Sequence, residues 1–187
     1  MSTLKVDTIL KRTGTGTITL GQSGDTISIP SGATLSSAGT NTLEGIANTP
    51  AFEAYLSANQ SMPNATYTKI QFNTETYDSN GTYDNSSNYR FTPALSGKYL
   101  IYASTRASTT TDFNNLQIIL RKNGSDVFIQ TTRNTHNDSI NMIATFDANT
   151  TDYFEIFGYQ DSGGSINFNG GSSDSPTRFG AYRLIGV

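Results

Sequence analysis

Residues 72–102 read FNTETYDSNGTYDNSSNYRFTPALSGKYLIY, and this stretch decides the fold. It begins at the end of a predicted strand, 66–73, crosses a polar loop and enters a second predicted strand, 98–105. Two sets of residues alternate in that second strand: Tyr99, Ile101 and Ala103 on one face, Leu100 and Tyr102 on the other. Alternation of β-branched and aromatic residues with a period of two is typical of a strand with one buried face.

The rest of the chain from residue 50 onward continues this pattern of short strands and turns. The clearest unit is a hairpin, in which predicted strands at 115–123 and 126–133 flank the turn dipeptide Asn123-Gly124. Further strands are predicted at 52–57, 139–148, 152–160 and 177–187, with a long Gly/Ser loop at 162–176. About eight to ten short strands without a convincing helical pattern predict an all-β sandwich.

A spaced series of anchor residues runs through this region: Phe72, Asp78, Tyr83, Phe91 and the triplet Gly97-Lys98-Tyr99. The series resembles the signature of the globular head domain of complement component C1q, in the C1q/tumour-necrosis-factor superfamily of trimeric jelly rolls. The gap between Tyr83 and Phe91 is one residue longer than usual, and Ile101 and Ala103 stand where aromatic residues are typical. Segments 50–54 and 179–184 are similar to that family's first and last strands. The resemblance covers residues 50–187 and implies a ten-stranded jelly-roll β-sandwich whose last strand is central in the inner sheet.

The same resemblance implies a homotrimer, with residues of the inner sheet packed around a threefold axis. The matching positions, and therefore the candidates for the trimer interface, are Phe52, Tyr55, Tyr99, Ile101, Phe179 and Tyr182. Some of these side chains must instead fill the core between the sheets. A shift of one residue in register exchanges the two faces of a strand, so the sequence leaves this assignment open.

Residues 13–42, TGTGTITLGQSGDTISIPSGATLSSAGTNT, have a different texture. Short apolar pairs recur between Gly and Pro residues, and one copy of such a segment cannot bury them. Three copies wound around one axis can, which predicts a β-rich trimeric stalk; a flexible Gly/Ser/Thr linker is the alternative. The candidate packing residues are Ile18, Leu20, Ile27, Ile29 and Leu35. We predict an N-terminal attachment segment and stalk at 1–49 and a head at 50–187.

Composition narrows the possible partners. The chain has 12 Lys and Arg against 15 Asp and Glu, a net charge of -3, and no Cys. Nucleic-acid binding needs a basic stripe, so no nucleic-acid partner is expected. Without Cys there is neither a disulfide framework nor a thiolate metal site. No apolar run approaches the length of a membrane span, and residues 1–11 lack the apolar core of a signal peptide, so neither feature is expected.

No arrangement of residues in the sequence indicates an enzyme. His136 is the only His and lies in a polar loop. Paired carboxylates could serve a glycosidase, but these candidates occur at a density that chance explains: Asp152, Glu155 and Asp161. We therefore expect no catalytic residue, no cofactor and no metal.

The polar loop at 78–88 and its flanks carry the candidates for ligand contact. Aromatic rings beside amides and carboxylates suit sugars, which offer both C–H faces and hydroxyl groups. The candidates for glycan contact are Tyr77, Tyr83, Tyr89, Asp78 and Asn80. Alternatively, Tyr83 and Tyr89 are packing positions of the family. The spacing of Asp78, Asn80 and Asp84 suggests calcium superficially, but the closing bidentate Glu of a helix-loop-helix calcium site is absent, which favours a solvated loop.

Two phrases near the N-terminus, STLKVDTI at 2–9 and GDTISIPSGATL at 24–35, are similar to the opening of fibre-type virion proteins of tailed bacteriophages. This resemblance implies a trimeric fibre or head-decoration protein on the phage particle surface. Its N-terminal segment would dock on other virion proteins, and its head would contact host-surface polysaccharide. The alternative is a structural protein that stabilises capsid or tail and has no receptor role.

Overall fold

The computed structural model describes residues 19, 21–34, 48–133, 138–172 and 175–185, and these contain no helix. The chain divides into two units, Met1–Thr42 and Leu43–Val187. In the first unit, residues 21–34 form two turns, closed by hydrogen bonds from Asp25 N–H to Gln22 O and from Ala33 N–H to Pro30 O, and no strand. Ile27 and Ile29 are exposed in this single copy, and the other candidates for stalk packing, Ile18, Leu20 and Leu35, lie outside the described residues. The trimeric stalk stays a prediction.

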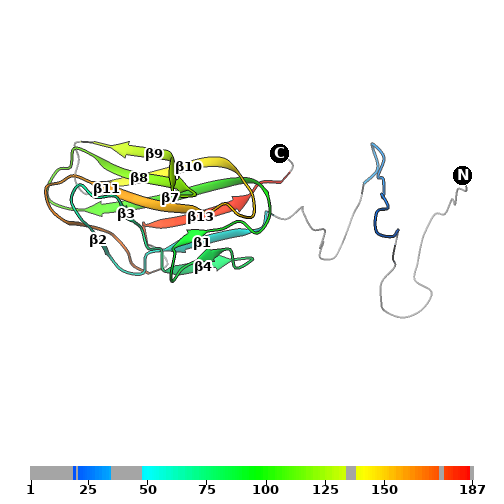
Figure 1. The fold of residues 1–187 in the computed structure, drawn as a ribbon, viewed down its shortest axis with the longest axis horizontal. Helices are drawn as coiled ribbons and strands as arrows, with labels where there is room; N and C mark the ends of the chain where they lie inside the picture. The colour runs from blue at the N-terminus through cyan, green and yellow to red at the C-terminus, as the bar shows by residue number, and fades with distance from the viewer. Residues whose placement is uncertain (1–18, 20, 35–47, 134–137, 173–174, 186–187) are drawn as a thin grey trace, which may run out of the picture. The chain divides into compact units, whose positions relative to one another are not determined.

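The second unit is a head made of two antiparallel sheets (Figure 1). Five strands follow one another across the inner sheet: β4 (Thr74–Asp78), β1 (Ala51–Tyr55), β13 (Arg178–Arg183), β7 (Gly97–Ser108) and β10 (Ser139–Ala148). Two short strands extend this sheet at the C-terminal end of β7, past the part that pairs with β13. There β12 (Ile166–Phe168) pairs with β7, and β2 (Gln60–Met62) pairs with β12. The last strand lies between β1 and β7, which confirms its predicted central position.

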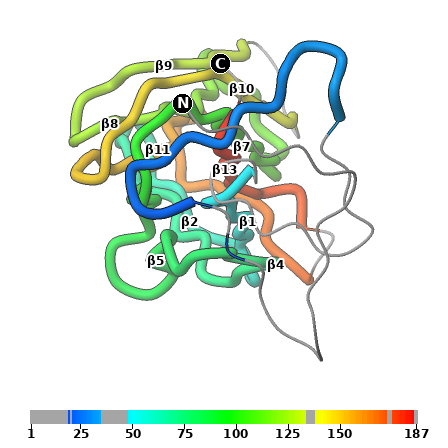
Figure 2. Tube along the Cα trace, turned by 90° about the vertical axis from the view of Figure 1, so that its right-hand side faces the viewer, coloured from blue at the N-terminus to red at the C-terminus, as the bar shows by residue number. Residues whose placement is uncertain are grey.

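The outer sheet forms the second layer, as the view in Figure 2 shows. Its strands, in spatial order, are β5 (Tyr83–Asp84), β6 (Arg90–Phe91), β11 (Phe154–Gln160), β8 (Leu116–Lys122) and β9 (Ser125–Thr132), and β3 (Thr68–Lys69) also pairs with β11. The hairpin of β8 and β9 at Asn123-Gly124 is confirmed. Both turn residues have positive φ, 52° and 80°, as the twist-matched two-residue hairpin turn requires.

Two parts of the predicted strand pattern are wrong. Only Thr68–Lys69 (β3) of the strand predicted at 66–73 is a strand, because the chain then crosses from the outer sheet to the inner sheet at β4. The loop predicted at 162–176 contains β12, because Ile166 and Phe168 point into the core. The described residues form thirteen strands in place of the predicted eight to ten, and the excess consists of segments of two or three residues.

A cluster of aromatic rings joins the two sheets at the centre of the core. Phe52 of β1 stacks on Tyr83 of β5 with ring centroids 4.6 Å apart, and on Phe91 of β6 at 4.9 Å. Phe179 of β13 meets the Phe52 ring edge to face at 5.0 Å. Each such aromatic pair adds about 0.5–1.5 kcal/mol beyond the burial of its surface. The cluster therefore fixes which faces of the two sheets meet.

We expect Phe179→Ala to lower the free energy of unfolding by about 3–5 kcal/mol, because it leaves a cavity in this cluster. Leu95→Ala is the control, since Leu95 is 47% exposed and its truncation is expected to change stability little. Chemical denaturation of both variants at equal protein concentration measures the difference. Equal losses for the two variants would contradict the assignment of the core.

A buried carboxylate ties the β8–β9 hairpin to the turn before β11. Asp152 accepts hydrogen bonds from Asn149 N–H at 2.9 Å and from Asn123 Nδ2 at 2.7 Å, and pairs with Lys122 Nζ at 2.9 Å. These interactions lower the pKa of Asp152 to about 2. A carboxyl group with a lowered pKa in the folded state stabilises the fold above its ordinary pKa and loses that contribution as the pH falls.

We therefore expect the Asp152 contribution to be complete above about pH 4 and to disappear between pH 3.8 and about 2. Denaturant unfolding of the wild type and of Asp152→Asn at neutral pH and at pH 2.5 measures this contribution. The wild type should lose more stability on acidification than the variant. An identical loss in both proteins would show that Asp152 has no such role.

Candidate functional surfaces

The outward face of the inner sheet carries an ordered set of polar and aromatic side chains, which we call the tyrosine face: Glu53, Tyr77, Tyr102, Arg178 and Tyr182. Strand register brings residues directly opposite one another across five strands in the order Tyr77, Glu53, Gly180, Tyr102 and Ile143. Residues paired in this way share one face of a sheet and interact with one another. The tyrosine face therefore covers four neighbouring strands, and Ile143 continues it onto a fifth, β10.

Glu53 is the centre of the tyrosine face. Its carboxylate accepts hydrogen bonds from Tyr102 Oη at 2.8 Å, from Arg178 Nη1 at 2.7 Å and from Thr76 Oγ1 at 3.0 Å. Tyr102 reaches Glu53 by lying across Gly180, where an added Cβ would stand only 2.3 Å from the tyrosine oxygen. The one formal negative charge at this centre is therefore neutralised within the same subunit.

The pKa values of two tyrosines on this face, Tyr102 and Tyr77, are raised. Burial, and next the hydrogen bond to Glu53, raise the pKa of Tyr102 well above its ordinary value. Burial, and next the hydroxyl of Tyr182 that accepts its hydrogen bond, do the same for the pKa of Tyr77. The rings of Tyr102 and Tyr182 stack with centroids 6.0 Å apart. The face presents aromatic surface and internally bonded hydroxyls, a composition compatible with burial against another protein.

The six predicted interface residues fall on two different faces. The prediction is wrong for four of them, because these side chains are fully buried between the sheets: Phe52, Tyr99, Ile101 and Phe179. The register had been left open in the sequence, and the structure places the core on the face that carries these residues. Tyr182 belongs to the tyrosine face, and Tyr55 lies on the same side of β1 as Glu53, where Arg178 stands 5.7 Å from its ring. These two remain candidates for the trimer interface.

The predicted glycan contacts do not form one site. Tyr83 is a core residue whose hydroxyl donates to Phe72 O at 3.1 Å, so its role as an exposed ligand contact is wrong. Tyr77 belongs to the tyrosine face, and Asn80 is an exposed loop residue. The Asp78 carboxylate is bound within its own loop, where it accepts from the N–H groups of Asn80 and Tyr83. Tyr89 alone joins the groove described next.

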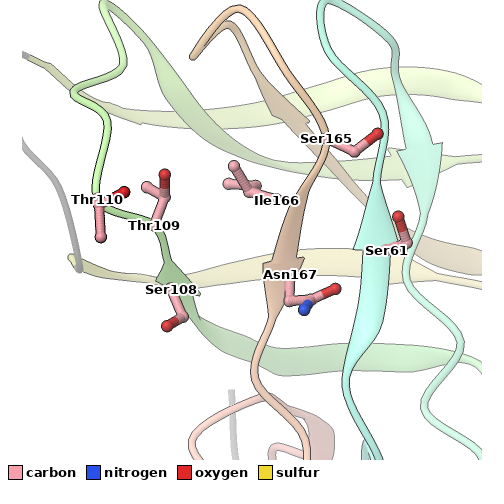
Figure 3. A pocket seen from close by; sticks show the side chains of 7 residues that line it. All are labelled: Ser61, Ser108, Thr109, Thr110, Ser165, Ile166 and Asn167. Carbon is pink, nitrogen blue, oxygen red and sulfur yellow. The ribbon is translucent and has the colours of Figure 1, made fainter.

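Two hollows with uncharged linings meet at Ser61, and we call them together the polar groove. The first has a volume of about 480 Å³ and is lined by Ser61, Ser108, Thr109, Thr110, Ser165, Ile166 and Asn167 (Figure 3). The second, of about 310 Å³, lies among Leu56, Ala58, Asn59, Gln60, Ser61, Gln71, Asn73 and Tyr89. Ser61, Asn167 and Ser108 lie opposite one another on the neighbouring strands β2, β12 and β7.

The first hollow lies at one end of the head. The β1 strand begins at Ala51, which pairs with Tyr182, and the neighbouring Arg183 pairs with Tyr99 near the start of β7. Ser108 is the last residue of β7, nine residues beyond Tyr99, which corresponds to about 30 Å along a strand. The first hollow is therefore at the far end of the head from the point where β1 begins.

Each of the three carboxylates considered for acid–base chemistry forms a hydrogen bond or an ion pair with another side chain. Glu155 pairs with Lys69, Asp161 accepts from both nitrogens of Asn115, and Asp152 braces the hairpin described above. His136 lies outside the described residues. Within the described part of the chain, no group of three or more His, Cys, Asp or Glu could hold a metal ion. In that same part, no helix has the length and apolar character that crossing a membrane requires.

Comparison with known proteins identifies the fold and not a close relative. No family model and no curated protein matches the chain. The globular domain of zebrafish complement 1qA protein superimposes with a TM-score of 0.53 and 14% identity, over 73% of this chain and 98% of that one. Murine APRIL gives 0.55 and 12%, over 72% and 98%, and PRD1 vertex protein P5 gives 0.52 and 12%, over 72% and 96%. The head thus has the C1q/tumour-necrosis-factor-like jelly-roll fold that its anchor residues predicted.

The close approach of Tyr102 to Gly180 makes a specific substitution informative. We expect Gly180→Ala to destabilise the head by about 1–3 kcal/mol, because the added methyl group must displace the Tyr102 ring from Glu53. Gly171→Ala is the matched control, since an added Cβ there meets no atom within 4 Å. Denaturant unfolding measures both changes. Equal stability of the two variants would argue against the packing of the tyrosine face.

Proposed function

We propose that the protein is a homotrimeric structural component of a phage particle, a fibre or head-decoration protein whose head contacts host-surface glycan. The C1q/tumour-necrosis-factor-like fold supports the trimer, since the family resemblance implies one. The N-terminal resemblance to fibre-type virion proteins supports the location, and PRD1 vertex protein P5 is among the proteins that share the fold. The observation that carries the proposal is the apolar continuation of the tyrosine face at Ile143.

Ile143 is 63% exposed in one copy and lies directly opposite Tyr102 on the neighbouring strand. Burial of apolar surface contributes about 25 cal/mol per Å², so an exposed Ile on the edge strand of this sheet favours association. Unpaired charges would oppose that association, but Glu53 and Arg178 are already paired within the subunit. Three copies would therefore bury this face without leaving a charge unpaired.

Glycan contact at the head is the part of the proposal that concerns the host. Three heads on one axis would present three equivalent sites, so weak single contacts would add to firm attachment. The proteins that share the fold give no reason to expect an enzyme. The second candidate is a structural protein that stabilises capsid or tail and has no receptor role, which the PRD1 vertex protein among the fold neighbours favours equally.

A pair of matched substitutions tests the trimer. We expect Ile143→Asp to shift the protein from trimer to monomer, because a buried, unpaired carboxylate costs about 3–5 kcal/mol. Ile129→Asp makes the same chemical change on β9 of the outer sheet, where the residue is 49% exposed, and should leave the trimer intact. Size-exclusion chromatography with light scattering measures the mass of each variant. A trimer that tolerates Ile143→Asp as well as Ile129→Asp would refute the assignment of this face.

A further inference from the structure

We infer that the polar groove at the far end of the head is the glycan site and that its ligand is an uncharged oligosaccharide. This inference rests on the proposed function and adds to it the place of contact and the chemical class of the sugar. Three properties of the groove carry it: unused hydrogen-bonding groups, the absence of ionisable side chains from its lining, and a rigid backing.

The first hollow gathers polar side chains that have no partner within the described residues. The hydroxyl groups of Ser61, Ser108, Thr110 and Ser165 and the amide of Asn167 make no hydrogen bond there, although all line the same hollow. Loop polar groups elsewhere behave differently. Asp84, for example, accepts from the backbone N–H groups of Ser86, Ser87 and Asn88. The groove therefore keeps donors and acceptors available, and hydroxyl and amide groups pair well with sugar hydroxyls.

The lining of both hollows lacks any Asp, Glu, Lys, Arg or His. An anionic sugar would find no cation to pair with and would lose part of its hydration, which disfavours charged polysaccharides. A neutral sugar loses no charge hydration and exchanges its hydrogen bonds with water for bonds to the groove. A third hollow of comparable size contains both Asp84 and Arg90, so an uncharged lining is not a general property of this surface.

Tyr89 provides an aromatic ring at the second hollow. Its side chain is half-buried, and its backbone has φ of +49°, a left-handed conformation that is uncommon for a bulky residue. Such conformations cluster at ligand sites, where the surrounding structure holds them in place. A ring of this kind can lie against the C–H face of a sugar while the amide of Gln71, on the same hollow, reaches its hydroxyls.

The backing of the groove is fixed by buried hydrogen bonds. Gln160 is fully buried, and its Nε2 donates to Met62 O at 3.0 Å and to Gly164 O at 2.8 Å. These bonds hold β2 beside the loop that carries Ser165. At the second hollow, Gly170 comes so close to Ala58 that an added Cβ would lie 2.1 Å from its carbonyl oxygen, and Gly170 N–H donates to Asn59 Oδ1 at 3.0 Å. A preorganised groove loses less conformational entropy on binding.

The test uses the full-length chain and an array of defined glycans. Uncharged members are fragments of dextran, mannan and galactan, and anionic members are dextran sulfate and polygalacturonate. Ser61→Trp fills the junction of the two hollows, and Asn167→Ala removes an amide from the first. Ser125→Trp is the matched control, because Ser125 is also an exposed strand residue but lies in the β8–β9 hairpin, away from the groove. Sedimentation checks that each variant keeps the assembly state of the wild type.

We expect binding to one or more uncharged glycans. Ser61→Trp should lower the apparent affinity at least about tenfold, Asn167→Ala should lower it less, and Ser125→Trp should leave it unchanged. Because no charges pair, the affinity should stay nearly constant as salt is raised. Binding confined to anionic glycans, or binding that survives Ser61→Trp, would overturn this inference and leave the glycan role of the proposed function standing. If the intact assembly binds no glycan on the array, this inference and the glycan role of the proposed function both fail. The structural role without a receptor is then favoured.

Discussion

The two faces of β7 are the constraint on which the rest of the head depends. This strand pairs with β13 on one side and β10 on the other, so its register decides which residues of three strands share a face. Tyr99, Ile101 and Ala103 point into the core, and the aromatic cluster of both sheets closes over that side. The alternate residues around Tyr102 point outward and form the surface that we assign to assembly, whereas Ser108, on the same side but about 20 Å further along β7, borders the polar groove. Because side chains alternate between the two faces of a strand, the register that places one set in the core also determines which set points outward.

The outward face of the inner sheet carries a charged residue whose burial in an assembly would be unfavourable without a partner. Glu53 would be an unfavourable charge inside an assembly, but Tyr102, Arg178 and Thr76 satisfy it within its own subunit. This arrangement needs Gly180, because only the absence of a side chain lets the Tyr102 ring cross β13. The polar groove differs, because most hydroxyl and amide groups of its first hollow are not hydrogen-bonded within the described residues and face solvent. The head thus combines an internally satisfied face suited to permanent contact with a groove suited to reversible contact.

Much of the fold could be predicted from the sequence, because local signals determine it. The alternation in 98–105, the Asn123-Gly124 hairpin and the strand at 139–148 all appear where the pattern placed them. The division of aromatic residues between core and outward face could not be predicted, since Phe52 and Tyr55 differ only by register. The groove was missed for another reason. Ser61, Ser108 and Asn167 lie far apart in the sequence and meet only because their strands pair. Small polar residues in so Ser- and Asn-rich a chain give no local signal. The outward position of Tyr102 and Glu53 did have a local sequence signal, because both residues stand between neighbours that are buried.

Sedimentation equilibrium of the full-length chain at low micromolar concentration tests the central claim most directly, because the assignment of the outward face to assembly depends on the mass in solution. The account predicts a single species with three times the 20.2 kDa mass of one chain. A folded species with the mass of one chain, stable at that concentration, would contradict it.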